Sequence, residues 1–173
     1  MKGKSVRLRR ATIDDYDFCK QLYDDISYEI LYGNRKAFGL PEIENDKEDD
    51  FEIDFEAPKL TKDWFEKAIT IWRHKVYIIE IKKQGESISI GYFYVAKSGK
   101  GESNRIRSWR MLEEYFDWKE ETLKCLLKRK ELINKKITIN ILKTDCEFEW
   151  LVEKFGFGED DSVLSTLSLI NQG

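Results

Sequence analysis

Three apolar segments with strand-like patterning follow one another closely in the middle of the chain, at residues 76–82, 87–96 and 105–112. Short polar stretches that contain glycine separate them, at residues 84–86 and 98–101. Links this short join antiparallel neighbours, because a parallel pair needs a crossover of about a dozen residues or more. The sequence therefore predicts three consecutive antiparallel strands at the centre of the fold.

Strand and helix periods alternate on both sides of this centre. Residues 6–9 alternate between apolar and basic, as in a strand with one wet face. Apolar residues then recur every three or four positions from residue 16 to residue 30, as in an amphipathic helix. Apolar spacing and capping residues predict five later elements, namely helices from Thr61, from Asp117 to Ile133 and from Thr144, and strands at residues 137–141 and 163–170.

This order of elements predicts the architecture of the whole chain. Strands and helices alternate, and a stretch with nine carboxylates at residues 42–56 separates the first two helices and predicts a loop. We find no internal repeat and no linker that divides the chain. The expected structure is one α/β (α+β) domain over residues 1–173, with a mixed, mostly antiparallel central sheet flanked by helices.

The composition argues against several functional classes. Thirty Lys and Arg residues against thirty-three Asp and Glu residues leave a net charge of -3, which does not suit a dedicated nucleic-acid or membrane-surface binder. Three cysteines without a CxxC pair and a single histidine, His74, indicate neither a disulfide framework nor a metal site. No apolar run reaches the roughly 18 residues that span a bilayer, and the start does not resemble an export signal. We therefore expect a cytoplasmic protein with no metal cofactor, no nucleic-acid partner and no membrane association.

Three short phrases occur in an order that is typical of one superfamily. They are Leu-Arg-Arg-Ala-Thr-Ile-Asp-Asp at residues 8–15, Ile-Gly-Tyr-Phe at residues 90–93 and Leu-Val-Glu-Lys-Phe-Gly-Phe at residues 151–157. With the predicted order of elements, they make nearly the whole chain resemble the GNAT N-acetyltransferase superfamily. The resemblance implies that acetyl-CoA binds in a cleft where two central strands part. It also implies a small-molecule or peptide amine acceptor, and it is compatible with a homodimer.

The segment that should hold the pyrophosphate departs from the family pattern. Family members usually place Q/R-x-x-G-x-G/A after the fourth strand, where backbone N–H groups at a helix start bind the anion. Here residues 111–122 contain no glycine and no arginine, and Asp117, Glu120 and Glu121 bring negative charge to the helix start. Lys119 and Lys124 can offset that charge. Two interpretations stay open, a degenerate but working phosphate site and a self-capped helix that binds no phosphate.

The resemblance also suggests which residues contact acetyl-CoA and which move protons. The cofactor contacts that it implies are Met111, Leu112, Trp118, Lys119, Glu120 and Lys124. Acetyl transfer needs a proton acceptor for the amine and a proton donor for the thiolate. Glu113 and Glu114, at the end of the strand that should edge the cleft, are candidate acceptors, and an exposed strand end is the simpler alternative. The usual tyrosine acid is replaced by Val152. Tyr115 or Tyr92 can substitute for it by proximity, and a core or rim tyrosine is the simpler interpretation of each.

Other residues allow both a functional and a simpler interpretation. Arg105, Arg107 and Trp109 share one strand face by period two, which suits RNA stacking or, more simply, a one-sided exposed strand. His74 is a partly exposed strand-start residue or a base. The acidic stretch at residues 42–56 is a solvated loop or attracts a cationic amine.

Two functional hypotheses follow from these observations. The first is an acetyl-CoA-dependent N-acetyltransferase. The second is a non-catalytic GNAT-like binding or regulatory protein that has lost the phosphate loop.

Overall fold

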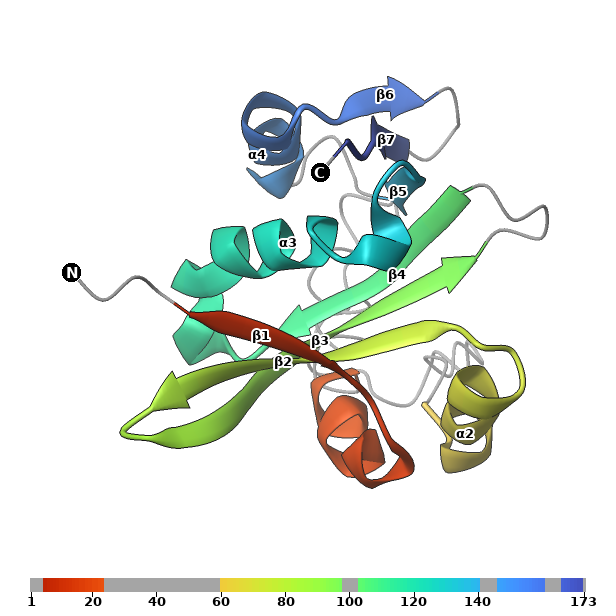
Figure 1. The fold of residues 1–173 in the computed structure, drawn as a ribbon, viewed down its shortest axis with the longest axis vertical. Helices are drawn as coiled ribbons and strands as arrows, with labels where there is room; N and C mark the ends of the chain where they lie inside the picture. Colours follow the sequence, from red (N-terminus) through yellow and green to blue (C-terminus); the bar gives the residue numbers. More distant parts are fainter. Residues whose placement is uncertain (1–4, 24–59, 98–102, 141–145, 161–165, 173) are drawn as a thin grey trace, which may run out of the picture.

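The computed structural model describes residues 5–23, 60–97, 103–140, 146–160 and 166–172 of the 173-residue chain. Its described strands form one seven-stranded sheet in the order β1-β2-β3-β4-β5-β7-β6 (Figure 1). The strands are β1 (Val6–Arg10), β2 (Lys75–Lys83), β3 (Glu86–Lys97), β4 (Ser103–Met111), β5 (Lys136–Asn140), β6 (Gly158–Asp160) and β7 (Thr166–Ile170).

Helices cover both faces of this sheet (Figure 1). The described α-helices are residues 16–23, α2 (Lys62–Thr70), α3 (Lys119–Leu127) and α4 (Cys146–Phe155). Three short 3-10 turns complete the order, namely η1 (Ile13–Asp15), η2 (Glu113–Trp118) and η3 (Lys130–Leu132). None of the described helices is long and apolar enough to cross a membrane.

The predicted antiparallel centre is confirmed. β2 pairs antiparallel with β3 and β3 with β4, and β1 joins the outer side of β2 in the same way. Among the described strands, β4 and β5 form the one parallel pair. The fold is therefore the mixed, mostly antiparallel sheet with flanking helices that the sequence predicted.

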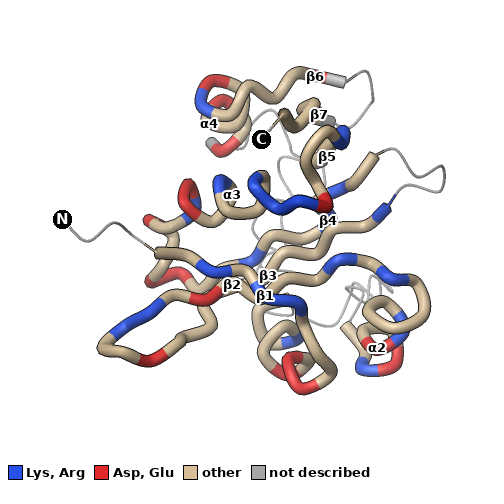
Figure 2. The backbone as a smooth tube through the Cα atoms, viewed as in Figure 1, with Lys and Arg blue, Asp and Glu red and all other residues tan. Residues whose placement is uncertain are grey.

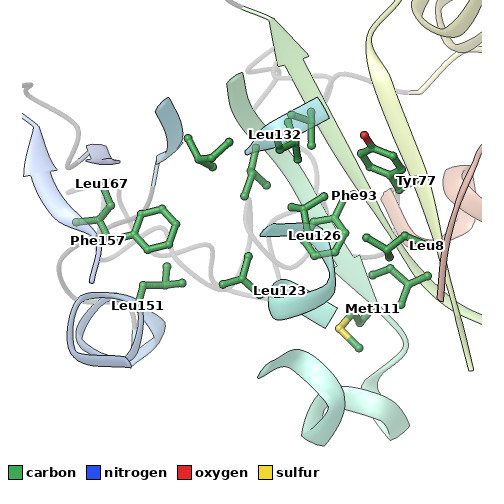
Figure 3. Close-up of a cluster of buried hydrophobic side chains, with 14 of the residues drawn as sticks. Leu8, Tyr77, Phe93, Met111, Leu123, Leu126, Leu132, Leu151, Phe157 and Leu167 are labelled. Atoms are coloured by element: carbon green, nitrogen blue, oxygen red, sulfur yellow. The ribbon is translucent and has the colours of Figure 1, made fainter. Parts of the chain in front are cut away.

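Side chains of the central strands alternate between two separate cores. Tyr77, Ile79 and Phe93 pack on the face covered by α3 and α4, called the α3 face below (Figure 3). Val76 and Ile78 pack on the opposite face with the helix at residues 16–23 and α2, called the α2 face. Each fully buried side chain of this size contributes about 1.5–3 kcal/mol of transfer free energy. The two cores fix which residues of β3 and β4 can line a site on each face.

Gly91 of β3 allows β4 to approach closely. A Cβ atom at Gly91 would lie 2.3 Å from the carbonyl oxygen of Arg110 and 2.9 Å from Cγ of Met111. Backbone of β4 thus occupies the place that a side chain would need. The glycine of the Ile-Gly-Tyr-Phe phrase therefore has a packing role in this chain.

The helix predicted to reach Ile133 ends earlier, at Leu127. Asn171, which is buried after β7, explains the difference. Its side-chain amide donates to the carbonyl oxygens of Leu127 at 2.8 Å and Leu132 at 2.9 Å, and its backbone hydrogen-bonds to residues 134–135. A residue far along the chain therefore satisfies the end of α3, which local sequence does not reveal.

The boundaries of the other helices and strands differ less from the predicted ones. β6 was not predicted, because three residues are too short to show a period, and it pairs with β7. The first predicted helix is confirmed for residues 16–23. Residues 24–30, the acidic stretch at residues 42–56 and the predicted helix start at Thr144 lie outside the described residues.

Candidate functional site

β4 and β5 part after a short parallel ladder. Residues 103–106 of β4 pair with residues 136–139 of β5. β4 then continues to Met111, whereas β5 ends at Asn140. Within the described chain, residues 107–111 therefore have no strand neighbour on the β5 side.

A β-bulge stands where the two strands part. In the register of β3 and β4, Tyr94 lies opposite Ser108 and Val95 lies opposite Ile106. Arg107 between them has no opposite residue. A bulge of this kind changes the alternation of side chains along the strand.

The bulge changes which residues share a face of β4. Arg107 and Ser108 both line a pocket on the α2 face. Trp109 packs on the α3 face, where its ring stacks on Phe93 with 5.2 Å between centroids. The expectation that Arg105, Arg107 and Trp109 share one face is therefore wrong, because it assumed an unbroken period of two.

The pocket on the α2 face has a volume of about 540 Å³. It lies between α2 and strands β2 to β4, and half of its lining residues are aromatic. The aromatic residues are Tyr23, Trp64, Phe65, Tyr92 and Tyr94. We call this space, with Arg107 and Ser108 at its β4 edge, the aromatic pocket.

Two tyrosine hydroxyls of the aromatic pocket are buried without a hydrogen-bond partner among the described residues. Tyr92 and Tyr94 are 3% and 5% exposed. Ser108 acts to lower the pKa of Tyr92, but the two hydroxyls do not meet hydrogen-bond geometry. An unpaired buried hydroxyl costs about 1–3 kcal/mol, and most such groups are paired with protein or water. Both tyrosines line the pocket and have unused hydrogen-bonding capacity.

Burial sets the protonation of these phenols and of the neighbouring histidine. It raises the pKa of Tyr92, and that of Tyr94 to about 12, so both remain neutral at pH 7. Burial, followed by the charges of Arg107 and Lys75, lowers the pKa of His74. His74 is half-buried before β2 and stacks on Tyr94 at 5.4 Å. The interpretation of His74 as a partly exposed strand-start residue is confirmed.

The segment between β4 and α3 forms the 3-10 turn η2. The N–H group of Tyr115 donates to the carbonyl of Leu112 at 2.9 Å, and the N–H group of Lys119 donates to the carbonyl of Phe116. α3 begins at Lys119 with no side-chain cap, so the predicted cap at Asp117 is wrong. Figure 2 shows acidic positions along this passage. Backbone donors that could face a phosphate are partly used inside the turn.

The structure separates the six predicted cofactor contacts. Met111 is 3% exposed in the α3-face core, and Trp118 packs against that core. Leu112 packs on the α2 face. The remaining three, Lys119, Glu120 and Lys124, lie together on the first two turns of α3.

Both lysines that could offset the acidic helix start are paired with carboxylates. Lys119 pairs with Glu147 of α4, and Lys124 pairs with Glu120. Glu120 also pairs with Lys154 at 2.6 Å. These pairs are partly exposed, so each contributes about 1 kcal/mol or less. A phosphate at this position would compete with the carboxylates for both ammonium groups.

The structure brings Glu113 and Glu114 together at the end of β4. Both are exposed, and with Leu112 they line an open hollow of about 520 Å³. Tyr115 is half-buried and packs against the α3-face core. The two carboxylates are therefore accessible, while the phenol ring belongs partly to the core.

An aromatic stack that the sequence did not reveal joins β4 to α4 on the α3 face. The rings of Trp109 and Trp150 stack with 6.3 Å between centroids. The rings of Trp150 and Phe155 contact edge to face, with 5.0 Å between centroids. Lys119 lies 5.8 Å from the centre of the Trp109 ring. No local pattern predicts this cluster, because its members come from separate elements.

Cys19 and Cys125 are poorly suited to act as nucleophiles. Burial raises the pKa of Cys19 to about 12 and also raises that of Cys125. Both thiols are therefore protonated at neutral pH, as expected for packing residues. No group of three or more His, Cys, Asp or Glu side chains lies together among the described residues.

No family model matches the sequence, and no curated protein matches it. Solved structures do match. A spermidine N-acetyltransferase SpeG chimera from Vibrio cholerae and hSSAT superposes with a TM-score of 0.62 at 15% identity, covering 96% of each chain. An N-acetyltransferase from Staphylococcus aureus superposes with a TM-score of 0.60 at 12% identity, covering 96% of this chain and 98% of its own. PaiA N-acetyltransferase from Thermoplasma acidophilum, in complex with coenzyme A, superposes with a TM-score of 0.55 at 10% identity. The match covers 95% of this chain and 97% of the other.

These matches define the class of structure. The chain has a GNAT-like α/β fold along nearly its whole length, as the sequence resemblance implied.

Proposed function

We propose that the protein is an acetyl-CoA-dependent N-acetyltransferase that acts on an amine acceptor. One observation carries the proposal: the aromatic pocket adjoins the place where β4 leaves β5. Arg107 and Ser108, which line the pocket, are the first two β4 residues beyond the ladder with β5. A substrate in this pocket therefore lies beside the gap where the GNAT resemblance puts the acetyl donor.

The comparisons support this class of reaction. The neighbours quoted above are named as N-acetyltransferases, and one of them holds coenzyme A. Their coverage of both chains is nearly complete, so the likeness includes β4, β5 and α3.

The α3 face of β4 offers groups that suit the donor. Trp109 Nε1 is buried and has no hydrogen-bond partner among the described residues, and the Lys119 ammonium lies over the same ring. A buried N–H group suits an amide carbonyl, and an ammonium group suits a phosphate. Acetyl-CoA supplies the acetyl group as a thioester. Of the six residues that the resemblance implies, Lys119, Glu120 and Lys124 lie together on α3 and are assigned to hold it, whereas Met111, Leu112 and Trp118 pack in or against the two cores.

Proton transfer is assigned to the end of β4. Glu113 or Glu114 accepts the proton that the acceptor amine loses, directly or through a water molecule. Tyr115, the next residue, donates a proton to the leaving thiolate. The exposure of the two carboxylates supports the first role, because it leaves them accessible to solvent.

Binding of the donor tests the proposal before any acceptor is known. We expect coenzyme A and acetyl-CoA to bind saturably in calorimetry and to compete with each other. A ligand at about one hundred times its Kd adds about 2.7 kcal/mol of stability, which a thermal shift detects. Absence of binding at millimolar donor would overturn the acetyltransferase proposal.

A charge-matched pair of variants tests the assigned residues. We expect Lys119→Glu with Lys124→Glu to weaken binding of coenzyme A, because two cations near the pyrophosphate become anions. Lys128→Glu with Lys130→Glu, at exposed positions beyond the other end of α3, makes the same change in net charge. An equal loss of affinity for coenzyme A in both double variants would show only a general effect of net charge.

A second function is favoured by the turn between β4 and α3. The N–H groups of Tyr115 and Lys119 are used inside η2, and three carboxylates lie within it. A non-catalytic GNAT-like binding protein would keep the aromatic pocket and bind no coenzyme A. The donor titration separates the two functions, because only the enzyme requires a positive result.

A further inference from the structure

The aromatic pocket carries one formal charge in its described lining, and that charge is positive. Arg107 stands at the β4 edge and forms no ion pair within the described chain. Trp64, Phe65 and Tyr94 supply a wall of rings. Aromatic walls alone can hold cations, but a guanidinium beside them repels a polyamine and attracts an anion.

The hydrogen-bonding groups of the pocket suit an oxygen anion. Tyr92 and Tyr94 are neutral phenols with buried hydroxyls that lack a partner among the described residues. Ser108 adds another hydroxyl to the lining beside Arg107. A carboxylate accepts several hydrogen bonds and pairs with a guanidinium in a fixed geometry. The aromatic rings and the hydrogen-bond donors of the pocket together suit a ligand with a flat apolar body and an acidic end.

We propose that the aromatic pocket binds an aromatic carboxylate, and that the acceptor in the proposed acetyl transfer is an amine of this class, such as an aromatic amino acid. The ring packs against Trp64 and Phe65. The carboxylate pairs with Arg107 and accepts a hydrogen bond from Tyr94. The role as acceptor rests on the proposed function, whereas binding of the carboxylate does not. A volume of about 540 Å³ accommodates a ligand of this size.

Four probes test the proposal by calorimetry on the full chain without coenzyme A. L-Tryptophan has the ring, the amine and the carboxylate, indolepropionate lacks the amine, and tryptamine lacks the carboxylate. Spermidine lacks both the ring and the carboxylate and serves as a polyamine control. We expect the two carboxylates to bind, tryptamine to bind about tenfold more weakly and spermidine not to bind. Tighter binding of tryptamine or spermidine, or no binding of either carboxylate at millimolar concentration, would overturn the proposal.

Two arginines on the same strand provide a matched control. We expect Arg107→Gln to weaken indolepropionate about tenfold and to leave tryptamine unchanged, because only the carboxylate loses its partner. Arg105 is also exposed on β4 but does not line the pocket, so Arg105→Gln should leave both affinities unchanged. Equal effects of the two variants would contradict a specific carboxylate contact.

The outcome is independent of the donor titration. Binding of indolepropionate without binding of coenzyme A would keep the pocket assignment and remove the acetyltransferase. Binding of coenzyme A without either carboxylate would keep the enzyme and remove this acceptor class. Acetylation of L-tryptophan by acetyl-CoA, followed by release of free thiol, then tests the two proposals together.

Discussion

The Lys119 ammonium on the first turn of α3 pairs with the Glu147 carboxylate on α4. The pair joins two helices of the α3 face beside the ring of Trp109. The same ammonium group of Lys119 is the one that the proposed donor site assigns to a phosphate.

We predict that Glu147→Gln raises the affinity for coenzyme A severalfold, because Lys119 no longer has a competing anion. The pair is partly exposed, so the free energy of unfolding should fall by about 1 kcal/mol or less. Calorimetry and urea unfolding measure the two effects. Glu149→Gln, at an exposed position on the same helix, serves as the control. An unchanged or weaker affinity in Glu147→Gln would place the phosphate elsewhere.

Gly91→Ala should destabilise the fold by about 1–3 kcal/mol or more, because the new Cβ atom would meet the Arg110 carbonyl oxygen at 2.3 Å. Gly158 has open space at its Cβ position, so Gly158→Ala should stay within about 0.5 kcal/mol of the parent. Urea unfolding of both variants tests the contrast. Similar stabilities would show that β3 and β4 can move apart without cost.

Two tyrosine-to-phenylalanine changes should act in opposite directions. Tyr94→Phe removes a buried hydroxyl without a partner among the described residues, and we expect stability to rise by about 1 kcal/mol while ligand affinity falls. Tyr16 donates its hydroxyl to the carbonyl of Leu60 at 2.7 Å, so Tyr16→Phe should lower stability by about 1 kcal/mol. Thermal unfolding reports both signs. A destabilised Tyr94→Phe would show that this hydroxyl already has a structural partner.

Acid should weaken the fold through Glu131. Burial alone would raise its pKa, but hydrogen bonds from Tyr77 and Arg129 outweigh it and lower the pKa to about 2. Because the folded-state pKa lies below the unfolded value of 4.5, the stabilisation is present above pH 4.5 and disappears toward pH 2. Glu131→Gln should therefore reduce the loss of stability in this window.

The measurement for Glu131 is the free energy of unfolding between pH 2 and pH 6. Glu153→Gln, exposed on α4, provides a carboxylate of the same type as a control. Parallel curves for the parent and Glu131→Gln would contradict the prediction.

Local sequence was sufficient for the strands at the centre of the sheet and insufficient for the site beside them. Short links and alternating apolar residues determine β2, β3 and β4, since both signals act between chain neighbours. The bulge at Arg107 depends on the register against β3, so the alternation along β4 alone misassigned Trp109. The aromatic pocket combines Tyr23 with Ser108, so it forms only when helices and strands β2 to β4 have packed together.

The segment between β4 and α3 also has features that local sequence reveals and features that depend on distant residues. The absence of glycine at residues 111–122 was visible in the sequence, and the structure adds a compact 3-10 turn there. The partners of Lys119 and Lys124 were not visible, because Glu147 lies on another helix. Asp117 matched a capping pattern, but the turn places it before the first residue of α3.

The hydrogen bonds of Asn171 set an order of events during synthesis. Its side chain reaches two carbonyls at the end of α3 and in η3, and its backbone holds the link to β5. A nascent chain that has emerged from the ribosome only as far as β5 leaves those carbonyls to water. The junction between α3 and β5 therefore closes only after residue 171 has emerged, so a segment made later is required to complete a segment made earlier.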